Sequence, residues 1–255
     1  MKVSTANGKL SVVDYWTMEN ATDESNGDID LGSGGPMLLP DQTDSSGKTR
    51  HLLVAAGKDK SLWVADLDAM GQFNPSFNST IYQALAGALP GGMWSSPAYY
   101  NGQIYYGSNS QRLFAFLVNS ARVSSSPLST TPNTFRWPGT TPSISAYSTK
   151  NGIAWAVEDA TPAVLHAYVA ANLATELYNS NQAPSARDNF GDPNKFIVPT
   201  IANGKVYVGT PNSVAAFGLL ATGSLPVADG DHMLRNQSSG LCSTILDDRK
   251  RRASK

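Results

Sequence analysis

Short runs of alternating apolar and polar residues, separated by turns rich in Gly, Pro and Asn, dominate this chain of 255 residues. The clearest runs are Ser95–Phe116 ("SSPAYYNGQIYYGSNSQRLFAF") and Ile197–Gly218 ("IVPTIANGKVYVGTPNSVAAFG"). Each contains a proline, an Asn-Gly turn, an alternating strand that ends in glycine, and a second apolar strand. Because a period of two is typical of half-buried β-strands, the pattern predicts small antiparallel meanders.

The same unit recurs along the chain. Two copies with longer insertions begin at Gly34 and Thr140, and a partial copy covers Asn7–Trp16. The landmark prolines of the four longer copies lie 61, 45 and 57 residues apart, at Pro36, Pro97, Pro142 and Pro199. Recurrence on this scale is typical of repeat architectures.

Turn chemistry supports the same interpretation. Three Asn-Gly pairs supply the positive φ angles of tight hairpins, and each precedes a run rich in Ile, Val, Tyr or Trp: Asn101-Gly102, Asn151-Gly152 and Asn203-Gly204. A single meander cannot bury both of its faces, so the copies must pack face to face, most economically around a ring. The sequence predicts an all-β fold, a β-propeller with about four to five blades of four-stranded antiparallel meanders that belong to a larger propeller. A β-sandwich built from the same hairpins is the alternative.

The remaining segments define the predicted boundaries. We expect the propeller over residues 1–220, a linker over 221–231 and a separate C-terminal segment over 232–255. The stretches Asn119–Pro138 and Asn179–Asn194 are predicted to be connections between blades or surface excursions. Ser79–Ala88 is predicted to form a short turn of helix at most.

Charge and cysteine usage exclude several classes of function. With 19 basic and 20 acidic side chains the formal net charge is −1, which predicts no general attraction to nucleic acid. No apolar run approaches the ~20 residues of a membrane span, and residues 1–10 lack the apolar core of a signal peptide. Cys242 is the only cysteine, and the three histidines lack metal-ligand spacing, so no metal site is expected.

Two stretches, "DIDLGSGGPMLLPD" and "GKDKSLWVADLDAMGQF", resemble the PQQ-like propeller repeats of quinoprotein dehydrogenases. The resemblance covers about residues 2–220 and is closest to uncharacterised bacterial propeller proteins that share "WAVED", "NSNQ" and "ARDNFG". It implies PQQ and calcium as cofactors, Asp28 or Asp30 as catalytic base and Lys58 as a quinone contact, and Asp66 matches a further position of the motif. The chain departs from that family because one cysteine cannot form its adjacent-cysteine disulfide, and its tryptophan-docking motif and calcium-binding blades are absent.

The same residues also have a purely structural interpretation. Asp28 and Asp30 precede a glycine-rich stretch, where Asp side chains often hydrogen-bond local amides in surface turns. Lys58 at a hairpin tip would keep a sheet edge from pairing with another chain.

A second group of polar residues is a candidate ligand site. Glu158 and Asp159 follow one strand, and Arg187 and Asp188 lie in a later loop. If the two loops meet at the central channel, a carboxylate and guanidinium pair would bind a polar ligand or a cation. An ion-pair network that holds the loops together is the alternative.

The C-terminal segment "HMLRNQSSGLC" resembles the opening of a ricin-type β-trefoil lectin. The positions that match are Leu234, Asn236, Ser239, Gly240 and Cys242. Residues 232–255 are too few to bury a trefoil core, so the resemblance indicates a truncated lectin module.

These observations predict a non-catalytic binding or scaffold propeller from an exported bacterial protein, extracellular or periplasmic in its full-length form. The expected partner is an unidentified small molecule or a glycan, and the lectin-like segment is the reason to expect association with carbohydrate. The alternative is a PQQ- and calcium-dependent quinoprotein dehydrogenase of alcohols or sugars.

Overall fold

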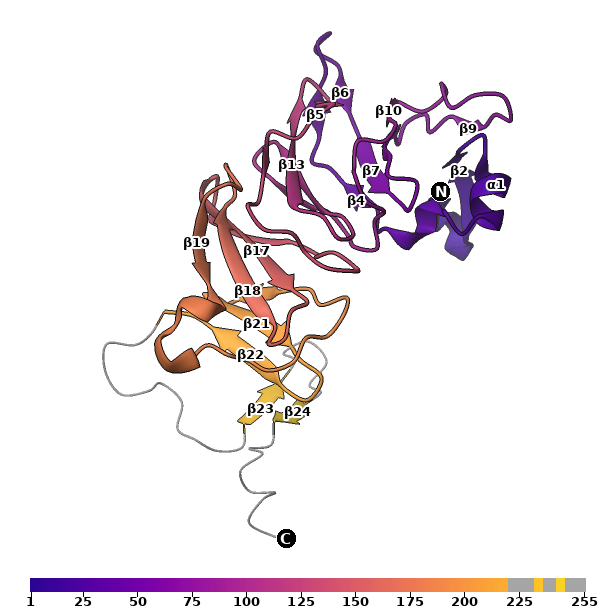
Figure 1. Ribbon diagram of the computed structural model, residues 1–255. Coiled ribbons are helices and arrows are strands. Elements are labelled where there is room, and N and C mark those ends of the chain that lie inside the picture. The colour runs from indigo at the N-terminus through magenta and orange to yellow at the C-terminus, as the bar shows by residue number, and fades with distance from the viewer. Residues whose placement is uncertain (220–231, 236–241, 246–255) are drawn as a thin grey trace.

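The computed structural model describes residues 1–219, 232–235 and 242–245, and this part of the chain is almost entirely β-structure. Its one α-helix is α1 (Ala21–Asn26), and no helix in the described residues has the length and apolar character needed to cross a bilayer. Four antiparallel sheets follow one another along the chain (Figure 1).

The first two sheets are built from the copies that begin at Gly34 and Ser95. The first sheet has the order β4 (Met37–Leu38), β7 (Leu52–Ala56), β8 (Leu62–Asp66) and β10 (Gln83–Leu85). The second sheet contains β11 (Ala98–Tyr100), β12 (Gln103–Gly107) and β13 (Leu113–Asn119), and β13 also pairs with β14 (Arg122–Val123) and β15 (Ser129–Thr130).

The next two sheets repeat the meander. The third sheet has the order β16 (Ser143–Tyr147), β17 (Lys150–Glu158), β18 (Val164–Val169) and β19 (Glu176–Asn179). The fourth sheet contains β20 (Thr200–Ala202), β21 (Lys205–Gly209) and β22 (Val214–Phe217).

Smaller elements complete the described chain. Four strand pairs lie outside the sheets: β1 (Lys2–Ser4) with β2 (Ser11–Asp14), β3 (Trp16–Thr17) with β9 (Gln72–Phe73), β5 (Gln42–Thr43) with β6 (Thr49–Arg50), and β23 (His232–Arg235) with β24 (Cys242–Ile245). The 3-10 turns are η1 (Ala6–Gly8), η2 (Leu31–Ser33), η3 (Ser180–Gln182) and η4 (Pro184–Ala186).

Alternating side chains join the second and third sheets to both of their neighbours. In β12, Ile104 and Tyr106 pack against the first sheet, and Tyr105 between them packs against the third. All three are at most 1% exposed. Burying one large apolar side chain contributes about 1.5–3 kcal/mol, so these interfaces hold the stack together.

The first strands of successive sheets approach one another closely. The Gly35 amide donates to the Ser95 carbonyl at 3.2 Å, and the Ser143 hydroxyl donates to the Pro199 carbonyl at 2.5 Å. A Cβ atom on Gly35 would lie 2.0 Å from the Ser96 hydroxyl oxygen. This close approach favours glycine at position 35.

The sheets therefore form a propeller-like stack in which each one packs on the next. Figure 1 shows them as an arc, not as the two facing sheets of a sandwich. The predicted all-β propeller-like fold is confirmed at this level, and within the described residues the sheets do not close into a ring.

Two of the three predicted Asn-Gly turns are confirmed. The φ angles are 45° and 78° at Asn101-Gly102, and 50° and 72° at Asn203-Gly204. The prediction for Asn151-Gly152 is wrong, because Tyr147 pairs with Lys150 and the hairpin turns three residues earlier, at Ser148-Thr149. Gly152 lies within β17, where a Cβ atom would meet the Tyr100 ring at 2.3 Å, so packing requires this glycine.

Other local predictions need correction. The segment predicted to be a turn of helix contains strand β10, because its residues pair with β8. Helix α1, which was not predicted, ends two residues before Asp28. The predicted connection at 119–138 contributes β14 and β15. The predicted linker and most of the lectin-like segment lie outside the described residues. The described part of that segment is the backbone pairing of β23 with β24.

The packing between sheets predicts a large effect for a single core truncation. Ile104 is 0% exposed between the first and second sheets, so Ile104→Ala should lower the free energy of unfolding by about 2–5 kcal/mol. Urea denaturation followed by circular dichroism measures the loss. The control Leu128→Ala, at a residue that is 55% exposed, should change stability by about 0.5 kcal/mol or less. Equal effects from the two variants would contradict this packing.

Candidate functional site

One end of the stack collects two kinds of loop. In an antiparallel meander the loop before the first strand lies at the same end as the turn between the second and third strands. Backbone hydrogen bonds join these loops across neighbouring sheets: Met93 donates to Gly57 at 3.0 Å, Asn109 to Gly92 at 2.9 Å, and Thr140 to Gly107 at 3.2 Å. We call this end the loop face.

Asp28, Asp30 and Lys58 meet on the loop face, although 28 residues or more separate Lys58 from the two carboxylates in sequence. The Lys58 ammonium forms ion pairs with Asp28 and, at 3.0 Å, with Asp30. Hydrogen bonds to Asp28 and then Asp30 raise the pKa of Lys58, and the bond from Lys58 lowers the pKa of Asp30. A carboxylate with a lowered pKa is a weak general base, so the cluster in this state favours an ion-pair role.

Three aromatic side chains continue from this cluster across the loop face. Trp94 lies beside Lys58, whose ammonium is 5.9 Å from its ring centroid. The ring centroids of Trp94 and Trp137 are 6.4 Å apart, and those of Trp137 and Phe196 are 6.0 Å apart, both edge to face. We call these three residues the aromatic row. Trp137 is 42% exposed and Phe196 57% exposed, so the row offers aromatic surface to a ligand.

The aromatic row was not among the sites predicted from the sequence, although a signal for it exists. Each ring stands three to five residues before a landmark proline: Trp94 before Pro97, Trp137 before Pro142, and Phe196 before Pro199. Equivalent positions in successive repeats lie at equivalent places in the stack, so the three rings come from neighbouring sheets.

Lys195 and Asp159 also border the aromatic row. The Lys195 ammonium lies 4.2 Å from the centroid of the Trp137 ring, a favourable cation–π position. Asp159 and Lys195 both line a small hollow of about 20 Å³ next to Trp94 and Phe196. A space of this size holds about one water molecule.

Glu158 takes part in a different set of contacts. The two ring nitrogens of His166 lie 3.0 Å from Glu158 and 2.7 Å from Glu176. His166 is 6% exposed and stacks on Tyr168 with 5.8 Å between ring centroids. Glu158 thus connects β17 to β18 and holds a satisfied buried histidine.

Arg187 and Asp188 pair with each other beside the third sheet. The Arg187 Nε atom donates to Asp188 at 2.7 Å, and the Tyr178 hydroxyl donates to the same carboxylate at 2.5 Å. Hydrogen bonds from Arg187 and Tyr178 lower the pKa of Asp188. The pair borders a cavity of about 560 Å³ between the third and fourth sheets, with Trp155 and Phe190 among its apolar lining. Among the described residues, no ion pair or hydrogen bond joins Glu158 or Asp159 to Arg187 or Asp188.

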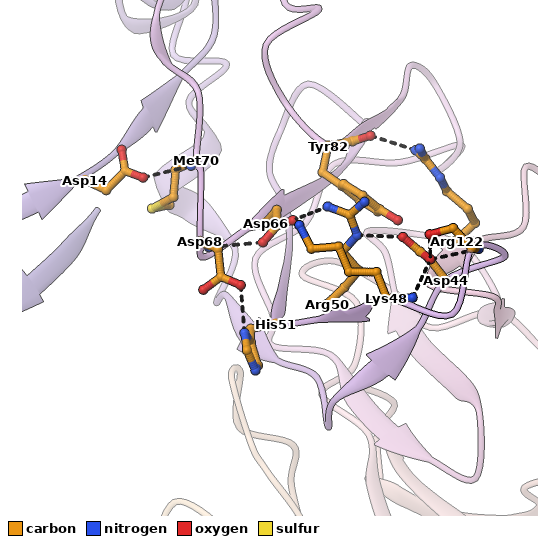
Figure 2. Close-up of polar contacts among 11 residues, drawn as sticks. Asp14, Asp44, Lys48, Arg50, His51, Asp66, Asp68, Met70, Tyr82 and Arg122 are labelled. Atoms are coloured by element: carbon orange, nitrogen blue, oxygen red, sulfur yellow. Dashed lines mark hydrogen bonds and ion pairs between the residues drawn. The ribbon is translucent and has the colours of Figure 1, made fainter.

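A polar network marks the opposite end of the first sheet (Figure 2). Arg50 forms ion pairs with Asp44 at 2.8 Å and with Asp66 at 3.0 Å. Asp66 is 5% exposed and also accepts the Asp68 amide at 3.0 Å. Asp66, which matches the quinoprotein motif, therefore holds Arg50 and the chain after β8 in place.

The cofactors that the resemblance implies, PQQ and calcium, need different groups. The Trp94 ring beside Lys58 suits a flat quinone, whereas the pairing of Lys58 with both Asp28 and Asp30 leaves no free positive charge for the carboxylates of PQQ. Within the described part of the chain, no three His, Cys, Asp or Glu side chains form a group that could hold a metal ion. The described side chains therefore offer no cluster of carboxylates to a calcium ion.

Comparisons with known proteins add little beyond the fold. No family model matches the chain, and no curated protein matches it in sequence. It is similar to the computationally designed Ika8 protein, with 9% identity, a TM-score of 0.44, and coverage of 73% of this chain and 45% of that one. For BamB from Moraxella catarrhalis the identity is 14%, the TM-score 0.42 and the coverage 72% and 49%. For the β-propeller domain of Cps50 (Swd1) from Myceliophteria thermophila the identity is 10%, the TM-score 0.41, and the coverage 75% of this chain and 54% of that one.

The chain spans about half the length of each of these three structures. The fold assignment rests on the order of strands in its own sheets and on the packing between them.

The network in Figure 2 predicts a pH-dependent contribution to stability. A hydrogen bond to Asp68 at 2.9 Å raises the pKa of His51 above its ordinary value of 6.5 and lowers that of Asp68 below 3.8. The pair's contribution to the free energy of unfolding is therefore fully present between pH 3.8 and pH 6.5. It is lost as pH rises through the raised pKa of His51, and also as pH falls through the lowered pKa of Asp68.

Melting temperatures of the wild type and His51→Gln from about pH 5 to pH 9 test this contribution. The difference in melting temperature between wild type and variant should be small, because both side chains are about half exposed. It should be greatest at the acidic end of the range. A difference that does not change with pH would show that the pair does not titrate in this way.

Proposed function

We propose that this chain is a binding propeller without a catalytic role, and that its ligand is a glycan held on the loop face. The aromatic row carries the proposal, since it joins rings from the loops before three successive sheets, and two of them, Trp137 and Phe196, are exposed. The C–H faces of sugar rings pack on aromatic surfaces, while hydroxyl groups need donors and acceptors nearby. Asp159 and Lys195 supply such groups at the edge of the row.

The rigidity of the loop face supports a binding role. The loops that carry Trp94 and Trp137 are hydrogen-bonded to a neighbouring sheet, and the Pro199 carbonyl after Phe196 accepts from the Ser143 hydroxyl. A Cβ atom on Gly92 would lie 3.1 Å from the Lys58 Cα atom. Aromatic groups that are fixed before binding lose little conformational entropy when a ligand arrives.

The wider setting belongs to the same proposal. We place these sheets in a larger propeller of an exported bacterial protein, working outside the cytoplasm, with a PQQ-like repeat as its unit. The lectin-like sequence after residue 231 supports the association with carbohydrate. The described sheets would then make up about four blades of that ring.

Removing one ring tests glycan binding. Screening on a glycan array should first identify a bound oligosaccharide, and Trp137→Ala should then weaken its binding about tenfold or more, because a central aromatic contact is lost. Tyr147→Ala is the matched control, since Tyr147 is 79% exposed at the opposite end of the third sheet. If the array shows no bound sugar, or if both variants bind like the wild type, the glycan proposal fails.

The alternative function is a PQQ- and calcium-dependent dehydrogenase of alcohols or sugars. The contact of Lys58 with Asp30 beside Trp94 favours it, because a bound quinone would accept the substrate's electrons near an ammonium group. No group of metal-ligating side chains in the described residues supports the calcium part.

Reconstitution tests the dehydrogenase directly. The protein is mixed with PQQ and calcium, and the absorbance of bound quinone and dye reduction by alcohols and aldoses are followed. On this alternative, Lys58→Met should reduce both signals more than tenfold, whereas Lys60→Met, at an exposed lysine of the same turn, should leave them unchanged. Wild-type protein with neither a quinone spectrum nor turnover would exclude it.

A further inference from the structure

Lys195 carries a positive charge that no described carboxylate neutralises. The contrast with Lys58 at the other end of the aromatic row is clear, since Lys58 pairs with both Asp28 and Asp30 and its side chain is only 17% exposed. Lys195 is exposed, lies over the Trp137 ring, and forms no ion pair with any described residue, including Asp159 in the same hollow. The row therefore ends at an ammonium group that forms no direct ion pair with a described residue.

The backbone next to Lys195 is strained. Phe196 has a φ angle of +63°, which bulky side chains rarely adopt. Phe196 is 57% exposed, so burial of its ring does not account for the strain. Strained residues that persist without a packing reason cluster at ligand sites, where they fix the geometry of binding groups. Phe196 and its neighbour Lys195 both contact Trp137, with 6.0 Å between the ring centroids of Phe196 and Trp137 and 4.2 Å from the Lys195 ammonium to the Trp137 centroid.

We infer that the ligand of the aromatic row is an acidic glycan whose carboxylate pairs with Lys195. This inference rests on the proposed function, because it takes the row as the sugar site. The pyranose ring packs on Trp137 and Phe196, and the carboxylate of a uronic acid reaches the Lys195 ammonium. Charge-assisted hydrogen bonds are about twice as strong as neutral ones, so Lys195 selects acidic sugars over neutral sugars of the same shape. Asp159, which lines the same hollow, accepts a hydroxyl hydrogen bond.

The test compares two trisaccharides that differ in charge, trigalacturonic acid and the neutral galactotriose, by isothermal titration calorimetry. The wild type should prefer the acidic sugar about tenfold, and this preference should shrink as salt screens the ion pair. Lys195→Met should bind both sugars with similar affinity, and Lys195→Arg should keep part of the preference. Lys205→Met is the control, because Lys205 is an exposed lysine on the fourth sheet outside the row. Equal melting temperatures show that the variants fold.

The outcomes separate the two claims. Wild-type protein that binds both sugars equally, or a preference that survives in Lys195→Met, overturns the role of Lys195 and leaves glycan binding standing. Wild-type protein that binds neither of these sugars, nor any other glycan, overturns the proposed function and the role of Lys195 together.

Discussion

The structure depends on one constraint, which is that each small sheet must bury two apolar faces. In the middle of the stack, successive side chains of a single strand point to opposite faces and so bury both of them. Tyr105 faces one neighbour while Ile104 and Tyr106 face the other, and in the third sheet Ala154 and Val157 divide in the same way. No sheet is a stable unit by itself, because a three- or four-stranded meander covered on one face leaves the other in water. The repeats therefore fold as a stack.

This stacking also determines where function is possible. Apolar packing uses the faces of the sheets, so the ends carry the polar and aromatic residues that remain. On the loop face, backbone hydrogen bonds between neighbouring sheets hold Trp94 and Trp137 in fixed positions. A binding surface made from several loops is thus as rigid as the stack beneath it, which is the usual relation between a scaffold and its functional loops.

The residues that resemble a quinoprotein motif are divided between the two ends of the first sheet. Lys58 follows β7 on the loop face, whereas Asp66 ends β8 opposite Leu52. Five strand residues separate these ends, roughly 17 Å at the usual rise per residue. Asp66 with Arg50 consequently stabilises the far end, and only Lys58, Asp28 and Asp30 remain available to a ligand near the aromatic row.

The sequence by itself determined the repeat, the all-β class and two of the three hairpin turns, because these depend on local periodicity and on Asn-Gly chemistry. It also brought Asp28, Asp30 and Lys58 forward as one group, which the structure joins. Only the tertiary structure decided that Gly152 packs against Tyr100 and that Glu158 pairs with His166 and not with Arg187. It also decided that three aromatic residues distant in sequence form one row. These features depend on which sheet lies beside which and at what register, and such information exists only once the sheets have packed.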